Sequence, residues 1–248
     1  MKITPIKTPI VKVHDDLFEI IKAAVPEIKE NSVLVVTSKI VALCEGNVAP
    51  VITGSRAEKQ QIVRAEADAY IEPSESKYDV MLAIKDQVLA VNAGVDMSNA
   101  DNQYVKLPKE SYKSAAGLWK AVKTHYGIKN VGILISDSKT IPLKWGTIGT
   151  ALAHCGFKGV RNRIGEKDIF GYEMQMTQVN IAEALAVAAV LNMGEVAEQQ
   201  PLCSIEDIPQ IEFQDKPPTP EEIKALEITP EDDVYAPILM SAPWKRNK

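Results

Sequence analysis

The sequence has few cysteines, no long apolar run and no excess of basic residues. Its three cysteines, Cys44, Cys155 and Cys203, lie far apart and form no C-x-x-C pair. This argues against a zinc ribbon or a disulfide framework and favours a reducing compartment. No apolar stretch approaches the roughly 20 residues of a membrane-spanning helix. With 28 basic and 33 acidic residues, the net charge of −5 does not favour nucleic-acid binding.

Signals for export and for the common nucleotide-binding motifs are also missing. The first sixteen residues, MKITPIKTPIVKVHDD, contain two prolines and lack the apolar core of a signal peptide. We therefore expect a cytoplasmic protein with neither a membrane nor a nucleic-acid partner. No G-x-G-x-x-G follows a strand and no P-loop sequence occurs, so the standard dinucleotide and P-loop interpretations are excluded.

Apolar periodicity predicts a mixture of strands and helices that do not alternate strictly. Continuous apolar runs at 32–36 and 131–135 predict buried strands, and 81–91 predicts a hairpin with its turn at Lys85-Asp86-Gln87. Helical spacing predicts helices over 111–125 and 180–198, the second with Asn180 as N-cap and Glu183 in a capping-box position. This pattern favours an α+β fold over a doubly wound sheet.

Three acidic residues follow or interrupt apolar sequence: Asp96 in VNAGVDMSN, Asp137 in LISDS and Glu195 in LNMGE. Carboxylates from distant segments, with the hydroxyl of Ser138, are the oxygen ligands that magnesium or manganese prefers. The alternatives are structural. Asp96 has the pattern of a turn former, Glu195 that of a solvated residue after a helix break, and Asp137 is evenly balanced between the two interpretations.

A glycine-rich segment follows the second acidic motif, at residues 145–159. Gly146 and Gly149 there either allow backbone N–H groups to approach a phosphate at a helix start or allow close packing of a short helix. Lys139 and Lys144 are the local cations that an anionic substrate needs, although surface charge is the usual role of lysine.

Taken in order, these segments resemble the coenzyme F420-0:L-glutamate ligase (CofE-like) family. The resemblance spans residues 5 to 203 and rests on five segments. They are TPIVKVHDDL (8–17), LVVTSKIVALCEGNV (34–48), VNAGVDMSN (91–99), ISDS with a following G-x-x-G-x-A (135–151), and the stretch from GEKDIFGYE to MGE (165–195). The first, third and last together are specific, whereas each alone is weak.

The resemblance implies a nucleotide-dependent enzyme, using GTP or ATP with a divalent metal and often potassium, that forms a γ-glutamyl amide bond. It implies metal ligation by Asp96, Asp137, Ser138 and Glu195, with Asp137 and Lys144 in catalysis. It places nucleotide contacts at Thr8, Pro9, Ile10, Val11, Ser38, Lys39, Asn99, Met193, Gly194, Glu195, Val196, Ala197, Glu198, Gln199 and Gln200. It also implies a mixed fold with antiparallel-rich sheets and flanking helices, and a homodimer with an active-site groove.

Several positions depart from the family pattern. The loop after the second acidic motif reads Thr140-Ile141-Pro142-Leu143-Lys144 where the family has two arginines, and Ala42-Leu43 replaces a serine–lysine pair. Lysine is not equivalent to arginine at a site that binds a phosphate or carboxylate. The loop resembles a bacterial branch described as folate-metabolism γ-glutamate ligases. A folate-type acceptor is therefore the favoured hypothesis, F420-0 the alternative, and a non-catalytic nucleotide- or metal-binding member the second alternative.

The resemblance also divides the chain. Residues 1–203 are expected to form the ligase domain. Residues 204–248, rich in Pro, Glu and Asp, are expected to form a C-terminal extension that carries a short helix.

Overall fold

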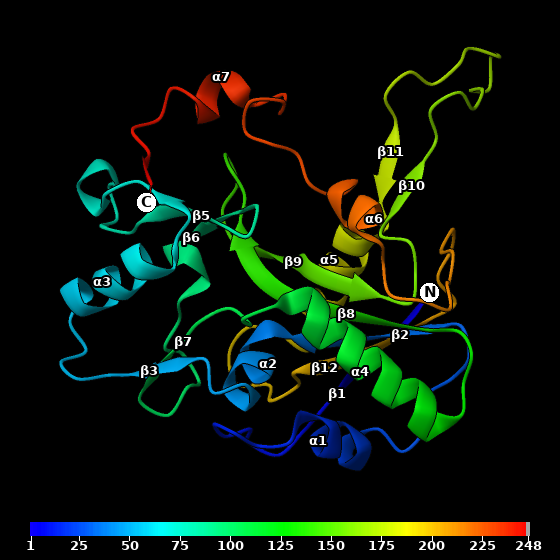
Figure 1. The fold of residues 1–248 in the computed structure, drawn as a ribbon, viewed down its shortest axis with the longest axis horizontal. Coiled ribbons are helices and arrows are strands. Elements are labelled where there is room, and N and C mark those ends of the chain that lie inside the picture. Colours follow the sequence, from blue (N-terminus) through cyan, green and yellow to red (C-terminus); the bar gives the residue numbers. More distant parts are fainter. Residues whose placement is uncertain (247–248) are drawn as a thin grey trace.

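The computed structural model describes residues 1–246 and is built around one five-stranded sheet (Figure 1). The strand order is β1-β12-β2-β8-β9. The strands are β1 (Lys2–Ile6), β12 (Leu202–Glu206), β2 (Ser32–Thr37), β8 (Val131–Thr140) and β9 (Thr147–Cys155). Only β2 and β8 pair in parallel, and the other neighbours are antiparallel. The mixed α+β class predicted from the sequence is confirmed, and β1 is an edge strand.

Both faces of this sheet are covered, which explains why its central strands are continuously apolar. Alternate residues of β2 enter two different cores: Leu34 and Val36 face one, and Val33 and Val35 face the other. The first core is closed by α1 (Leu17–Ala24), α2 (Ser38–Cys44) and α4 (Ser111–Tyr126). The second is closed by α5 (Ile181–Met193).

The helix ends follow from their capping residues. The Asn180 side chain accepts from the Glu183 N–H at 3.0 Å, as expected for the N-cap of α5. The predicted reciprocal bond is absent, because the Glu183 carboxylate accepts from the Thr150 hydroxyl at 2.8 Å instead. Helix α5 ends at Met193 rather than at 198, because Gly194 turns the chain with a φ of +85°.

A second, smaller sheet has the order β13-β4-β5-β6. It comprises β13 (Lys245–Arg246), β4 (Ala69–Tyr70), β5 (Leu82–Lys85) and β6 (Val88–Val91). The predicted hairpin turn is confirmed, with Asp86 and Gln87 at positive φ. Helix α3 (Arg56–Glu66) packs against η2 (Asn92–Gly94), the short turn that leads from β6 into Asp96.

Shorter elements complete the chain. The strands β3 (Val48–Pro50) and β7 (Gln103–Val105) pair with each other, and η1 (Pro73–Glu75) is a single turn. The pair β10 (Val160–Asn162) and β11 (Gln178–Asn180) carries a long loop that projects from the body as an arm, at the upper right of Figure 1.

The segment 145–159 differs from its sequence-based interpretation. No helix begins there, because residues 147–155 form β9, which pairs with β8 as a hairpin. Gly149 does allow close packing, but against helix α5: a β-carbon at this position would lie 2.3 Å from the carbonyl oxygen of Ala186. The glycine is therefore required by contact between the sheet and α5, and not by an anion.

The C-terminal residues pack onto both sheets. Ser204 to Glu206 belong to β12, so the central sheet crosses the expected boundary at residue 203. The expected short helix is present as α6 (Pro220–Lys224), followed by α7 (Ala236–Leu239), and β13 then pairs with β4. The last two residues of the expected extension lie outside the described residues. Within residues 1–246, no helix has the length and apolar character needed to cross a bilayer.

Two glycine-to-alanine variants test the packing of α5 on β9. Gly149→Ala should lower the stability by about 1–3 kcal/mol, because its methyl group overlaps the α5 backbone. Gly117→Ala is the matched control, because nothing lies within 4 Å of a β-carbon at this helical position. The control should raise the stability by about 0.5–1 kcal/mol. Urea unfolding measures both, and equal effects of the two variants would contradict this packing.

Candidate active site

The strand order brings the predicted motifs to one edge of the central sheet. Because β2 and β8 are parallel, their C-terminal ends meet, with Thr37 opposite Ser136. Strand β12 runs the other way and lies between β1 and β2, so Leu202 at its start pairs with both Val36 and Ile6. Four segments therefore converge at this edge: the segment after β1, the start of α2, the ISDS motif and the loop before β12.

Asp137 lies next to Ser38 at the junction of the two parallel strands. Burial is the main influence on its carboxyl group and raises its pKa to about 6. Hydrogen bonds from the Ser138 N–H and the Ser38 hydroxyl, together with the charge of Lys39, oppose this shift. The negative charge of the Asp96 carboxylate raises the pKa of Asp137 further, so the two carboxyl groups lie within electrostatic reach of each other.

Asp96 is held in a network with Lys39 and Ser98. The Lys39 ammonium donates to Asp96 Oδ2 at 2.6 Å and to the carbonyl and hydroxyl oxygens of Ser98 at 2.8 and 2.9 Å. The Ser98 hydroxyl also donates to Asp96 Oδ2, and the Met97 N–H donates to Oδ1. Burial alone would raise the pKa of Asp96, but the bonds from Lys39 and Ser98 lower it to about 2. Asp96 is thus an anion at neutral pH.

Glu195 meets Ser138 across the same edge. The Ser138 hydroxyl lies 2.9 and 3.0 Å from the two carboxylate oxygens of Glu195. This contact joins β8 to the loop that follows α5, although the two residues are far apart in the sequence. The structure therefore brings the predicted oxygen donors together as two neighbouring groups. One contains Asp96 and Lys39, and the other contains Ser138 and Glu195.

The loop of residues 194–200 is fixed by contacts from several segments. The Asn99 side chain donates to the Val196 carbonyl at 2.7 Å, and the Thr37 N–H donates to the Pro201 carbonyl at 3.0 Å. Within the loop, Glu198 accepts from the Val196 N–H at 2.8 Å and occupies the space that a side chain at Gly194 would need. The predicted nucleotide-binding residues of this loop and Asn99 are therefore neighbours.

The predicted N-terminal nucleotide segment lies against the same loop. Thr8 is buried, and its carbonyl accepts from the Gln199 side chain at 2.6 Å. Its N–H donates to the Gln199 carbonyl at 3.3 Å. Ile10 is exposed, so the segment from Thr8 to Val11 presents both its backbone and an apolar side chain beside the acidic edge.

The donor atoms match a hard divalent cation in chemistry, since carboxylate and hydroxyl oxygens are its preferred ligands. Their arrangement is not that of an assembled metal site. Among residues 1–246, no three acidic, histidine or cysteine side chains gather closely enough to hold a metal ion. Lys39 supplies the positive charge beside Asp96 in this structure. Metal ligation by these residues stays a prediction.

Lys144 lies away from these groups in the turn of the β8–β9 hairpin. The turn is exposed: Leu143 is 100% accessible and Trp145 91%. Trp145 packs edge-on against Tyr78, which follows η1, at 6.4 Å between ring centroids. Lys139 lies nearer to Ser138 but pairs with Glu183 at 3.5 Å. The catalytic role predicted for Lys144 is therefore not supported by any contact to Asp137 that the structure shows.

One residue beside the site was missed from the sequence, because α3 has the composition of a charged surface helix. Lys59 lies on α3, half-buried, within electrostatic reach of Asp96 and Lys39. Burial lowers its pKa, the Asp96 carboxylate opposes this shift, and Lys39 adds to it. The only available signal was spacing, since Lys59 precedes the apolar Val63 by four residues.

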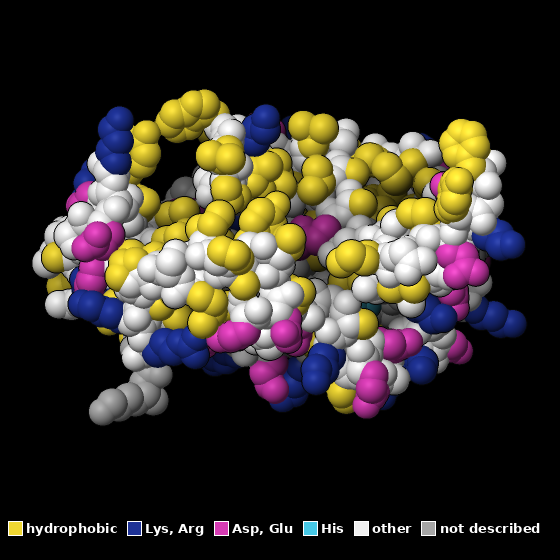
Figure 2. All heavy atoms as spheres, turned by 90° about the horizontal axis from the view of Figure 1, so that it is seen from above, with side chains coloured by type: hydrophobic (Ala, Val, Ile, Leu, Met, Phe, Trp, Pro, Cys, Tyr) yellow, Lys and Arg dark blue, Asp and Glu magenta, His cyan; other side chains and the backbone are white. Residues whose placement is uncertain are grey.

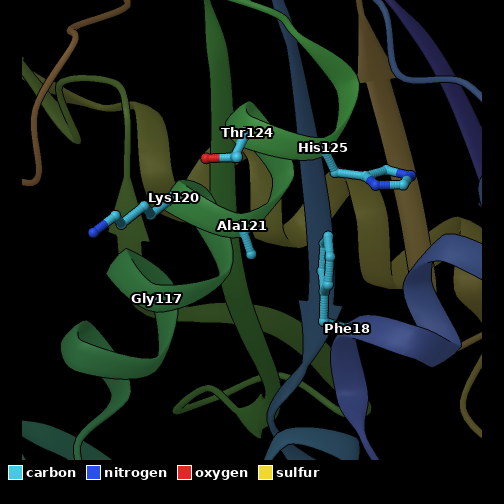
Figure 3. A pocket seen from close by; sticks show the side chains of 6 residues that line it. All are labelled: Phe18, Gly117, Lys120, Ala121, Thr124 and His125. Atoms are coloured by element: carbon cyan, nitrogen blue, oxygen red, sulfur yellow. The ribbon is translucent and has the colours of Figure 1, made fainter.

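A groove elsewhere on the surface has no part in this site. It lies between α1 and α4, with a volume of about 430 Å³ (Figure 3). Its lining residues are Phe18, Gly117, Lys120, Ala121, Thr124 and His125, and none of them was predicted to act in catalysis or binding.

The buried charge of Asp137 yields a stability prediction for the metal-free protein. The pKa of Asp137 is about 6 in the folded protein and 3.8 ordinarily, so the folded state binds this proton more tightly than the unfolded state. The resulting stabilisation is full below pH 3.8 and is lost as the pH rises through 6. Asp137→Asn should therefore raise the melting temperature at pH 7 and flatten its change between pH 4 and 7. The exposed Asp101→Asn is the control. A melting temperature for Asp137→Asn below that of the wild type at pH 7 would contradict the assignment.

Comparisons with known proteins agree with the arrangement of the motifs. The family model described as F420-0:Gamma-glutamyl ligase matches residues 5–207. The coenzyme F420:L-glutamate ligase of Methanococcus maripaludis strain C7 is 30% identical over 225 residues, which is 84% of this chain and 89% of that protein. The enzyme of the same name from Methanosarcina barkeri is 32% identical over 209 residues, 79% of this chain and 81% of that protein. The chain belongs to the F420-0:γ-glutamyl ligase family.

Proposed function

We propose that this ligase joins the amine of L-glutamate to a carboxylate of F420-0 through an amide bond, at the expense of GTP or ATP. The observation that carries the proposal is the meeting of the family's segments at one sheet edge, where Asp96, Asp137 and Glu195 lie beside the two predicted nucleotide-binding segments. The names of the family and of the two relatives described above supply the substrate class.

The chemistry requires two steps. The γ-phosphoryl group of the nucleotide is transferred to the acceptor carboxylate, which gives an acyl phosphate and a nucleoside diphosphate. The amine of glutamate then attacks the acyl carbon, phosphate leaves with the C–O bond electrons, and the amine loses a proton. The enzyme's contribution is positioning and electrostatic stabilisation of the phosphoryl oxygens.

Each side chain at the edge has a role in this scheme. In this scheme the charge of Lys39 offsets that of the phosphoryl group while its ammonium stays bound to Asp96 and Ser98. Asn99 and Gln199 hold the loop 194–200, which is the predicted nucleotide-binding segment. Asp137 is the predicted catalytic residue of the site, and its raised pKa of about 6 belongs to the metal-free protein. A divalent cation bound by Asp96, Asp137, Ser138 and Glu195 would supply further positive charge at the transferred phosphoryl group.

The acceptor favoured from the sequence was a folate-type molecule, and the comparisons support the alternative better. The relatives from Methanococcus maripaludis and Methanosarcina barkeri are both named coenzyme F420:L-glutamate ligase. The altered loop that suggested a folate is the exposed turn at residues 141–146, which lies beyond the acidic edge. Nothing in the structure requires that this turn selects a pterin.

The test is glutamate incorporation followed by mass spectrometry. F420-0, dihydropteroate and a reduced folate are each incubated with glutamate, magnesium or manganese, and GTP or ATP. We expect one glutamyl unit to be added to F420-0, at least a hundredfold less product with Asp137→Asn in line with losing an acid–base group (on the order of 10²–10⁴), and no product with a chelator present.

The exposed Lys120→Met is the matched control and should retain full activity. Product on a folate alone would restore the first hypothesis. Absence of product on every acceptor would contradict the proposed activity.

We further propose that the enzyme acts as a homodimer, as its family resemblance implies. The arm between β10 and β11 exposes several large apolar side chains: Ile169 (92%), Phe170 (78%), Tyr172 (74%) and Met176 (86%). Apolar side chains also gather over much of the upper face of the molecule (Figure 2). Exposed apolar surface of this extent is typical of an interface between subunits.

Light scattering tests the dimer. The wild type should have a mass near twice the 27.2 kDa of the chain, because the arm is expected to pack on a second copy. Phe170→Asp should shift the protein toward the monomer, since it places a charge in an apolar contact. Ile52→Asp changes an equally exposed apolar residue outside the arm and should leave the mass unchanged. A monomeric wild type would rule the dimer out.

A further inference from the structure

Lys59 is a half-buried lysine beside the acidic edge that has no place in the mechanism described above. It lies in the first half of α3, and Val63, one helical turn later, is fully buried. Residues four apart share one face of a helix, and long side chains lean toward its N-terminus. Val63 belongs to the same apolar cluster as Ala93 and Val95, which lead directly into Asp96. Lys59 therefore lies on the face of α3 that points toward Asp96.

The Asp96 carboxylate is already fully engaged by other donors. Its Oδ2 accepts from the Lys39 ammonium and from the Ser98 hydroxyl, and its Oδ1 accepts from the Met97 N–H. The Lys59 N–H donates to the Ser55 carbonyl at 3.2 Å, but within residues 1–246 the Lys59 ammonium makes no hydrogen bond or ion pair. Its ammonium group thus retains its donors, although Asp96 and Lys39 both act on it electrostatically.

A desolvated cation without an acidic partner is costly, and the cost falls when an anion binds beside it. The charged groups that act on Lys59 are the Asp96 carboxylate and a second cation, Lys39. A lysine ammonium is a compact charge with three donors, which suits the oxygens of a phosphoryl group. The alternative anion is a carboxylate group of the substrate. It carries less charge than the phosphoryl chain, and the planar pair of donors of an arginine suits it better than a lysine ammonium does.

We propose that Lys59 is a phosphate-binding residue of the ligase, which holds the phosphoryl chain of the nucleotide beside the charge of Lys39. This inference rests on the proposed function, because it assigns Lys59 to the same site. It extends the site from the edge of the central sheet to helix α3, which packs on the second sheet. A bound nucleotide then joins the two sheets through its phosphates.

Calorimetric titration of Lys59→Met tests the inference. The nucleotide used is whichever of GTP and ATP binds the wild type more tightly in the presence of magnesium, and its nucleoside serves as the phosphate-free probe. We expect the nucleotide to bind about tenfold more weakly or worse, the usual effect of losing a hydrogen bond to a charged group. Nucleoside binding should be unchanged, because only phosphate contacts are lost.

Two controls keep the result unambiguous. Lys120→Met removes an exposed lysine from α4 and should bind the nucleotide as the wild type does. Thermal unfolding of Lys59→Met should show no loss of stability, since methionine fits a half-buried position. Equal weakening of nucleotide and nucleoside, or of neither, overturns the inference, as does a wild type that binds no nucleotide.

The ligase assay separates this inference from the proposed function. A wild type that makes no product while Lys59→Met still loses affinity for the nucleotide alone would contradict the activity and support the role of Lys59. An active wild type with full nucleotide affinity in Lys59→Met would contradict the role of Lys59 and leave the activity standing.

Discussion

The insertion of β12 between β1 and β2 is the constraint on which the rest of the site depends. It forces the loop after α5 to cross the C-terminal ends of the parallel strands, because β12 runs antiparallel to β2. Glu195 then meets Ser138, and Gln199 meets Thr8, although the two residues of each pair are far apart in the sequence. The motifs are therefore neighbours because of strand order.

The two aspartates at this edge have pKa values shifted in opposite directions by their surroundings. Asp96 is kept charged by Lys39 and Ser98, whereas burial holds the pKa of Asp137 near neutrality. Two carboxylates within reach of each other, with pKa values pushed apart by their surroundings, are suited to different tasks. In the metal-free protein, Asp96 is therefore a fixed negative charge, whereas Asp137 takes up a proton near neutral pH.

The sequence was sufficient to predict elements whose pattern is local. The buried strands near 32–36 and 131–135 show as continuous apolar runs, and the N-cap Asn180 and the turn at Asp86 and Gln87 have local signals. The β8–β9 hairpin was misinterpreted, because glycines suited to a phosphate loop also suit close packing, and only the contact of Gly149 with α5 decides between the two.

In the candidate site, too, residues in local motifs could be identified from the sequence, and residues whose surroundings depend on packing could not. Asp96, Asp137 and Glu195 were identified from their motifs, and the structure brings their segments together. Lys144 lies in the exposed turn between β8 and β9, and its catalytic role stays a prediction. Lys59 was overlooked, because a half-buried lysine and a solvated one look alike in a charged helix. Its surroundings depend on how α3 packs, which is tertiary information.

The position of β12 also has a consequence for how the chain is made. A ribosome releases residues 1 to 201 before the strand that separates β1 from β2 is available, so the central sheet cannot close during most of synthesis. Pairings between such distant segments form slowly. Until then β1 and β2 expose unpaired edges, which are sites of mispairing. The edge of the central sheet at which the motifs meet is thus among the last parts to form.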